Sequence, residues 1–153
     1  MPICCVSIGL IKNMKPILGV IYDFDNDELY AGDISNSQST RNDIPIKVSD
    51  YVNKADGVLI TGLPHATDYS DQSLRDMIKD MQTWKKIRMI GSAAMAACYV
   101  ASGKAEMYME KGIYLWDIVA GAAIVESAGG QAEILNIRNN FQVDVVFSNS
   151  KIK

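Results

Sequence analysis

The segment Leu115–Gly130, LWDIVAGAAIVESAGG, constrains the fold of this chain more than any other feature of its sequence. It passes from an aspartate into a run of small and apolar residues and stops at two glycines. This pattern predicts a buried helix over Asp117–Ala128. Gly121 and its alanine neighbours would let that helix pack close to another element. Gly129 suits the left-handed position just past a helix end, with Gly130 following it.

Alternating apolar runs on either side of turn residues predict an α/β fold. The runs Ile3–Ile11 and Ile17–Tyr22, separated by a turn at 12–16, predict a hairpin, and Leu29–Ala31 adds a short third strand. Helical spacing of apolar residues predicts a helix over Asp71–Met81. The other expected elements are strands at Gly57–Thr61, Ile87–Ile90, Ala105–Met109, Ala132–Leu135 and Val143–Phe147, and a helix at Ser92–Ser102.

A shift in composition divides the chain. From Gly32 to Asp43 it is rich in Ser, Asn, Asp, Thr and Gln, which predicts a loop and a subdomain boundary. We therefore expect an antiparallel region over 1–43 and an α/β subdomain over 44–153.

Composition excludes several classes of protein. The chain has 153 residues, 48% of them hydrophobic, with a net charge of -3 and a pI near 5.1. That balance argues against binding to nucleic acid or to a membrane surface, since both favour a basic face. The N-terminus lacks the features of a signal peptide, and no apolar run reaches the ~20 residues of a transmembrane helix. Cys4, Cys5 and Cys98 lack metal-ligand spacing, so we expect reduced thiols in a cytoplasmic protein.

Two groups of polar residues resemble functional sites. Asp23, Asp25, Asp27 and Glu28 resemble the start of a calcium loop, but the glycine and glutamate that such a loop needs at its sixth and twelfth positions are absent. A solvated hairpin turn is the preferred interpretation. His65, the single histidine, is interpreted as a surface or loop residue and not as a catalytic one.

Asp117 allows two interpretations. As an N-cap or first-turn residue it would accept hydrogen bonds from free backbone N–H groups and interact favourably with the helix dipole. As a metal ligand it would hold a hard cation such as Mg²⁺ near a helix N-terminus that also attracts phosphate. Trp116 would wedge the preceding loop in place. One residue can serve both purposes.

The spacing ExGxxxWDxxAGxxIxxxAGG resembles the C-terminal signature of the inositol monophosphatase family. It is formed here by Glu110, Gly112, Trp116, Asp117, Ala120, Gly121, Ile124, Ala128, Gly129 and Gly130. Upstream, GSAAMAACYVASGKAEMYME resembles the strand–helix–strand segment before that signature. PICCVSIGLIKNMKPILGVIYDFDNDELYAG resembles the antiparallel strands that follow the family's first metal motif. The resemblance covers nearly the whole chain.

This resemblance implies the C-terminal portion of a layered αβαβα fold and a Mg²⁺-dependent phosphomonoesterase acting on a small phosphate monoester. Asp117 would be a metal ligand, and Glu110 would contact hydroxyls of the substrate. Gly91, Ser92 and Ala93, at a helix start, would face the substrate. Glu110 in this spacing favours inositol monophosphate over 3′-phosphonucleotides or fructose bisphosphate, while related enzymes also act on histidinol phosphate. Homodimers are common in the family and compatible with this sequence.

The chain also departs from the family pattern. The motif DPIDGTxNF and the acidic pair upstream of it supply most of the metal ligands in the family, and neither is present here. We therefore expect the chain to be the C-terminal part of a family member, with 1–43 a remnant of the N-terminal sheet region. No complete catalytic set is present, so the chain alone should have little or no phosphatase activity. The alternative is a non-catalytic family member or binding module that retains the fold.

Overall fold

The computed structural model describes residues 3–63 and 67–153; His65 therefore lies outside the described residues. Within them, the N-terminal part of the chain forms one antiparallel sheet, here called sheet A, with strand order β1-β2-β3-β4-β5. Its strands are β1 (Cys5–Lys12), β2 (Lys15–Asp23), β3 (Glu28–Asp33), β4 (Gln38–Arg41) and β5 (Ile44–Pro45). A short 3₁₀ helix, η1 (Ile34–Asn36), joins β3 to β4.

The rest of the described chain forms a mixed sheet, here called sheet B, with order β7-β6-β8-β10-β9. After the 3₁₀ helix η2 (Lys54–Asp56), the elements are β6 (Val58–Thr61), α1 (Asp71–Met81), β7 (Lys86–Met89), α2 (Ala93–Ala101), β8 (Met107–Tyr114), α3 (Leu115–Ser127), β9 (Gln131–Leu135) and β10 (Gln142–Ser148). Strand β6 is parallel to β7 and β8, while β10 is antiparallel to β8 and β9.

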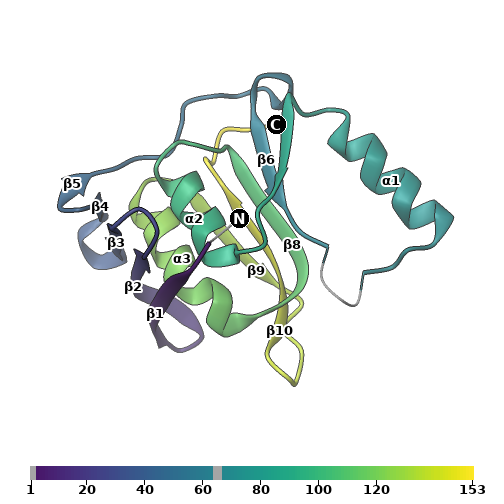
Figure 1. The fold of residues 1–153 in the computed structure, drawn as a ribbon. Helices are drawn as coiled ribbons and strands as arrows, with labels where there is room; N and C mark the ends of the chain where they lie inside the picture. The colour runs from purple at the N-terminus through teal and green to yellow at the C-terminus, as the bar shows by residue number, and fades with distance from the viewer. Residues whose placement is uncertain (1–2, 64–66) are drawn as a thin grey trace.

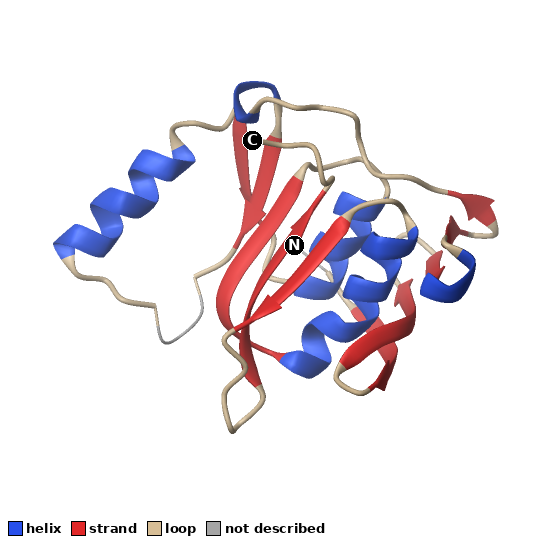
Figure 2. Ribbon diagram, turned by 180° about the vertical axis from the view of Figure 1, so that it is seen from behind, coloured by secondary structure: helices blue, strands red, loops and turns tan. Residues whose placement is uncertain are grey.

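Helices α2 and α3 form a layer between the two sheets (Figures 1 and 2). Both are mostly apolar, as expected of helices that lie in the core, and most of their residues are buried. Helix α1 lies outside this layer, beyond β6 and β7, and has no fully buried residue. The hydrophobic core therefore sits around α2 and α3.

A row of glycines lets α3 lie directly on sheet A. Gly9 pairs with Gly19, and Gly19 pairs with Gly32, so the three lie side by side across β1, β2 and β3. A Cβ built on Gly9 would lie 2.8 Å from the Ala120 nitrogen, and one on Gly32 would lie 2.5 Å from the Ile124 Cα. A side chain on Gly19 would overlap the α3 backbone. Only glycine allows the helix backbone to approach these strands so closely.

The opposite side of α3 packs tightly on α2. A Cβ on Gly121 would overlap the Cβ of Ala97. Helix α3 then ends in a Schellman motif, because Gly130 donates to the Val125 carbonyl (2.9 Å) and Gly129 donates to that of Glu126 (3.0 Å). Gly129 has φ +87°, the left-handed conformation that this ending requires.

The structure confirms the expected fold class of antiparallel strands followed by a mixed α/β sheet with helices. The helix at Asp71–Met81 has the expected bounds, and α2 begins after its N-cap Ser92. The expected loop over Gly32–Asp43 is wrong, because β4 pairs with β3 despite its polar composition. Strand β8 also runs five residues beyond the expected end at Met109, because β10 pairs with it up to Tyr114. The subdomain boundary after residue 43 stays a prediction, since sheet A continues to Pro45.

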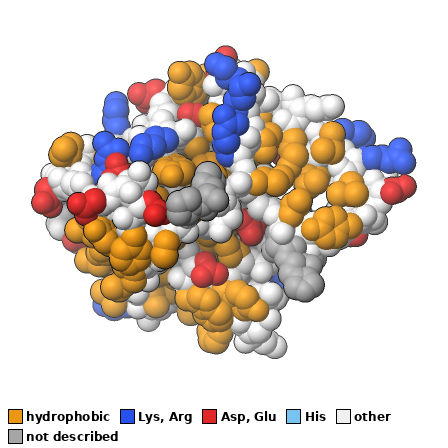
Figure 3. Space-filling view, viewed as in Figure 1, with side chains coloured by type: hydrophobic (Ala, Val, Ile, Leu, Met, Phe, Trp, Pro, Cys, Tyr) orange, Lys and Arg blue, Asp and Glu red, His pale blue; other side chains and the backbone are white. Residues whose placement is uncertain are grey.

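Sheet A leaves an apolar face uncovered. Val6, Ile8 and Leu10 alternate along β1 with the residues that face the helices, and Ile8 is 63% exposed. In the described part of the chain, β1 pairs only with β2 and is therefore an edge strand. Figure 3 shows apolar side chains exposed on this side of the molecule and along α1. Within the described residues, no helix has the length and apolarity to cross a membrane.

The contact between α2 and α3 can be tested at Gly121. We expect Gly121→Ala to lower the free energy of unfolding by about 1–2 kcal/mol, because overlap with Ala97 outweighs the gain in helix propensity. Adding Ala97→Gly should recover part of that loss, giving a coupling of about 1 kcal/mol in a double-mutant cycle measured by urea unfolding. Gly129→Ala is the control, because a Cβ there meets no atom within 4 Å and should show no coupling to Ala97. Additive effects at Gly121 and Ala97 would contradict this packing.

Candidate active site

The candidate site is a pocket of about 410 Å³ between the two sheets. It is lined by Cys5, Ser7, Gly62, Leu63, Gly91, Ser92, Ala93, Ala94, Glu110, Ile113 and Asp117. Gly62 follows the carboxyl end of β6, and Gly91 follows that of β7. Because ligands of α/β sheets bind beyond the carboxyl ends of parallel strands, the topology itself favours a site here.

The start of α2 forms one wall of the pocket. Ser92 is the N-cap, and its hydroxyl accepts a hydrogen bond from the Met95 backbone N–H at 3.3 Å. Gly91 precedes it with φ +73°, which turns the chain from β7 into the helix. The free N–H groups and the dipole at such a helix start favour an anion.

Asp117 comes from the first turn of α3 and lies on another wall. The expected helix start at Asp117 is two residues late, because Leu115 is already helical and donates its N–H to the Phe141 carbonyl at 2.9 Å. Tyr114 is therefore the N-cap, and Asp117 bonds back to its backbone. This is half of a capping box, with the acid at the third helical position.

Trp116 lies in the first turn of α3, and its expected role in wedging the preceding loop stays a prediction. It is 60% exposed and stacks on Tyr114, with ring centroids 4.6 Å apart and planes 8° from parallel. Phe141, in the turn before β10, lies 6.4 Å away. Neighbouring residues of a helix point in different directions. Asp117 therefore faces the pocket while Trp116 faces solvent.

Glu110 lies beside the end of β6. Thr61 pairs with Met109, which places Gly62 level with Glu110, and a side chain on Gly62 would overlap the Glu110 carboxylate. The buried Tyr108 donates its hydroxyl hydrogen to Glu110 Oε2 at 2.8 Å. One glycine and one tyrosine therefore orient this carboxylate.

The two pocket carboxylates are electrostatically unfavourable as they stand. Burial raises the pKa of Glu110 above its ordinary value, and the nearby charge of Asp117 raises it further against the opposing Tyr108 hydrogen bond. Burial also raises the pKa of Asp117, although its hydrogen bond to the Tyr114 backbone opposes this. A cation in the pocket would relieve both effects.

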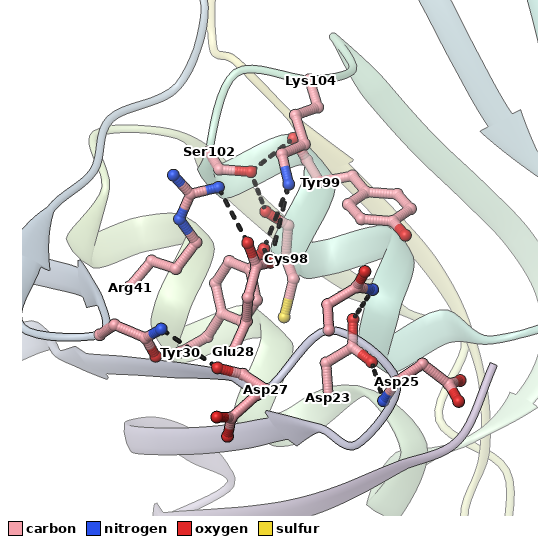
Figure 4. Close-up of polar contacts among 12 residues, drawn as sticks. Asp23, Asp25, Asp27, Glu28, Tyr30, Arg41, Cys98, Tyr99, Ser102 and Lys104 are labelled. Atoms are coloured by element: carbon pink, nitrogen blue, oxygen red, sulfur yellow. Dashed lines mark hydrogen bonds and ion pairs between the residues drawn. The ribbon is translucent and has the colours of Figure 1, made fainter.

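The acidic residues from the end of β2 to the start of β3 do not converge on a common point (Figure 4). Asp23 accepts hydrogen bonds from the Asp25 N–H (3.1 Å) and from the Asn26 side chain (2.7 Å). Glu28 instead pairs with Arg41 at 3.2 Å and accepts from the Tyr30 hydroxyl at 2.6 Å. No group of three potential metal ligands was found among the described residues. The arrangement is that of a hydrogen-bonded hairpin turn, and Asp23 is buried, which differs from the solvated turn that the sequence predicted.

The pocket brings together the five residues expected to bind metal or substrate, Gly91, Ser92, Ala93, Glu110 and Asp117. Three further residues line the pocket without any signal in the sequence that pointed to them: Cys5, Ser7 and Gly62. The alternation along β1 places Cys5 and Ser7 on the same face, but only the packing of α3 on sheet A shows that this face borders the pocket.

The fold and the pocket define a class of protein, an α/β protein in which helix starts and carboxylates meet near the carboxyl ends of parallel strands. The inositol monophosphatase family model matches residues 1–146, so this chain belongs to that family, as its signature suggested. Inositol monophosphatase 2 of Saccharomyces cerevisiae is 35% identical over an alignment of 140 residues that covers 84% of this chain and 47% of that protein. Nus factor SuhB of Pasteurella multocida is 34% identical over 131 residues, 85% of this chain and 49% of that protein.

The fold is also similar to solved structures. The structure of inositol monophosphatase from Anabaena (Nostoc) sp. PCC 7120 matches with a TM-score of 0.84 and 33% identity, over 96% of this chain and 59% of that one. The chain thus spans about half the length of the curated relatives it matches. The layered fold expected from the family resemblance is confirmed.

The electrostatics of the pocket predict the effect of Glu110→Gln on stability. The pKa of Glu110 is raised above its ordinary value of 4.5 in the folded state. At pH values above 4.5, the charge of Glu110 therefore lowers the free energy of unfolding. Glutamine still accepts from Tyr108, so at pH 7.5 the variant should melt higher by about 1–2 °C, a small effect because the site is only half-buried. The difference should shrink as the pH falls toward 4.5.

Glu133→Gln on β9 is the control, because this glutamate is exposed and the substitution should leave the melting temperature unchanged. Differential scanning fluorimetry at several pH values makes the comparison. A lower melting temperature for Glu110→Gln at pH 7.5 would contradict the electrostatic account.

Proposed function

We propose that this chain forms the substrate-binding part of a Mg²⁺-dependent phosphomonoesterase site that takes a small polyol phosphate such as inositol monophosphate. The observation that carries the proposal is the pocket itself, in which two helix starts and two carboxylates meet. The phosphate would lie at the start of α2, where Ser92 and Ala93 present the helix N-terminus. Glu110 would accept hydrogen bonds from substrate hydroxyls.

The metal donors can be compared with what Mg²⁺ requires. Mg²⁺ is typically held by one or two carboxylates together with substrate phosphate and water. Asp117 fits this role, because it is a partly desolvated carboxylate facing the pocket. When bound, the ion would neutralise phosphoryl charge and polarise water. This chain contributes one such ligand and the orientation of the substrate.

A second candidate function is that of a non-catalytic binding module that keeps the fold but has no metal site. It is favoured by the absence of the DPIDGT motif from the sequence and by the lack of a three-ligand cluster among the described residues. In that case, Asp117 would act only in the first turn of α3. The two functions differ in whether Mg²⁺ and a phosphate monoester bind together.

Binding and turnover can be measured on the same sample. We expect calorimetry to show Mg²⁺-dependent binding of myo-inositol 1-phosphate that is weakened at least tenfold by Asp117→Asn, about 1.4 kcal/mol. Phosphate release across a Mg²⁺ titration should be absent or very slow, because the chain supplies too few metal ligands.

The other outcomes are also informative. Mg²⁺-dependent turnover that disappears in Asp117→Asn would show that the missing ligands come from another chain and would rule out the non-catalytic alternative. A folded sample with neither binding nor turnover would overturn the proposed function.

Gly62→Ala tests the position of the Glu110 carboxylate without changing its charge. The new methyl group would overlap the carboxylate, which can rotate away because it is the end of a flexible side chain. We expect a change of less than about 1 kcal/mol in stability and weaker binding of myo-inositol 1-phosphate, with binding of inorganic phosphate unchanged. Gly57→Ala, beside the distant Glu106, is the matched control and should affect neither ligand. Equal weakening of both ligands by Gly62→Ala would argue against contact between Glu110 and the polyol.

A further inference from the structure

Ser7 lies on the face of β1 that borders the pocket. Its neighbours on that face are Cys5, whose Sγ is 4.0 Å from the Ser92 hydroxyl at the start of α2, and Gly9, which packs against Val119 and Ala120 of α3. Ser7 is therefore placed between the start of α2 and the second turn of α3. It lines the same pocket as Asp117 and Glu110.

The Ser7 hydroxyl is buried and has no hydrogen-bond partner among the described residues. Two other buried serines of this chain are satisfied by backbone carbonyls. Ser39 donates to Ile124 at 2.7 Å, and Ser127 donates to Ala123 at 2.6 Å. An unpaired buried hydroxyl is unfavourable, so such a group in a folded protein requires an explanation. The pocket beside it is where a partner atom can reach it.

We propose that Ser7 positions the bound phosphate monoester, its hydroxyl donating a hydrogen bond to a phosphate oxygen. This inference rests on the proposed function of the pocket and adds a residue to it. A phosphate oxygen is favoured over a polyol hydroxyl because Ser7 lies near the start of α2, where free N–H groups favour an anion. The donor geometry of a hydroxyl suits that acceptor, since a serine O–H can rotate toward it.

The stability of the ligand-free protein separates a ligand-binding role from a structural one. Ser7→Ala should leave the melting temperature unchanged or raise it, because it removes an unpaired buried hydroxyl and breaks no hydrogen bond. Ser39→Ala, the matched control on the same sheet, should lower it by about 2–4 °C because it removes the buried hydrogen bond from Ser39 to the Ile124 carbonyl. A loss in Ser7→Ala comparable to that in Ser39→Ala would show that the hydroxyl is structural and would overturn the proposal.

Binding measurements then test the ligand. With Mg²⁺ present, we expect Ser7→Ala to weaken inorganic phosphate and myo-inositol 1-phosphate by a similar factor of about ten, while Ser39→Ala binds both as the unaltered chain does. If the unaltered chain binds both ligands and Ser7→Ala binds them equally well, the role of Ser7 is wrong and the proposed function stands. If the unaltered chain binds neither, both are overturned. Weakening of myo-inositol 1-phosphate alone would place the hydroxyl on the polyol and contradict the phosphate contact.

Discussion

The close approach of α3 to sheet A is the contact on which the rest of the structure depends. Gly9, Gly19 and Gly32 lie side by side on three strands, and the backbone of α3 rests on them. On its other side, α3 meets α2 at Gly121. Because helix, sheet and second helix are held at backbone distance, the starts of α2 and α3 are brought to one pocket together with the pocket-facing side of β1.

The pocket combines features that are unfavourable without a ligand. Two carboxylates share a partly desolvated space, and the pKa of each is raised mainly by burial. A buried serine hydroxyl in the same pocket has no partner among the described residues. Helix N-termini, by contrast, favour negative charge. A ligand set that contains both a cation and an anion, such as the proposed metal and phosphate monoester, would satisfy all of these groups.

Membership in the inositol monophosphatase family agrees with this chemistry, and the chain spans about half the length of the curated relatives it matches. The uncovered apolar face of β1 and its pocket-facing side are the two opposite faces of one strand, since alternate residues point to each. A change in the twist or position of β1 would move Cys5 and Ser7, so a partner bound at this edge strand would also affect the pocket.

Local patterns in the sequence were sufficient for the elements whose signals are local. The helical spacing of Leu74, Met77, Ile78 and Met81 located α1, and the helix expected over Ser92–Ser102 corresponds to α2, for which the structure shows Ser92 to be the N-cap. Local pattern did not predict β4, whose polar composition is not typical of a strand although it pairs with the preceding strand β3, or the far end of β8, which is a strand through pairing with the distant β10. It also began α3 two residues late, since the hydrogen bond from Leu115 to Phe141 joins segments far apart in the chain.

By itself, the sequence determined the family, the order of most elements, and the residues Glu110 and Asp117 as candidates for chemistry, because a long spaced signature and local periodicity are properties of the chain alone. Only the tertiary structure decided that Gly9, Gly19 and Gly32 form one row, that Trp116 points outward, and that Ser7 and Gly62 belong to the pocket. These facts depend on strand register and on the packing of α3, which arise from contacts between residues distant in sequence, and no local pattern encodes them.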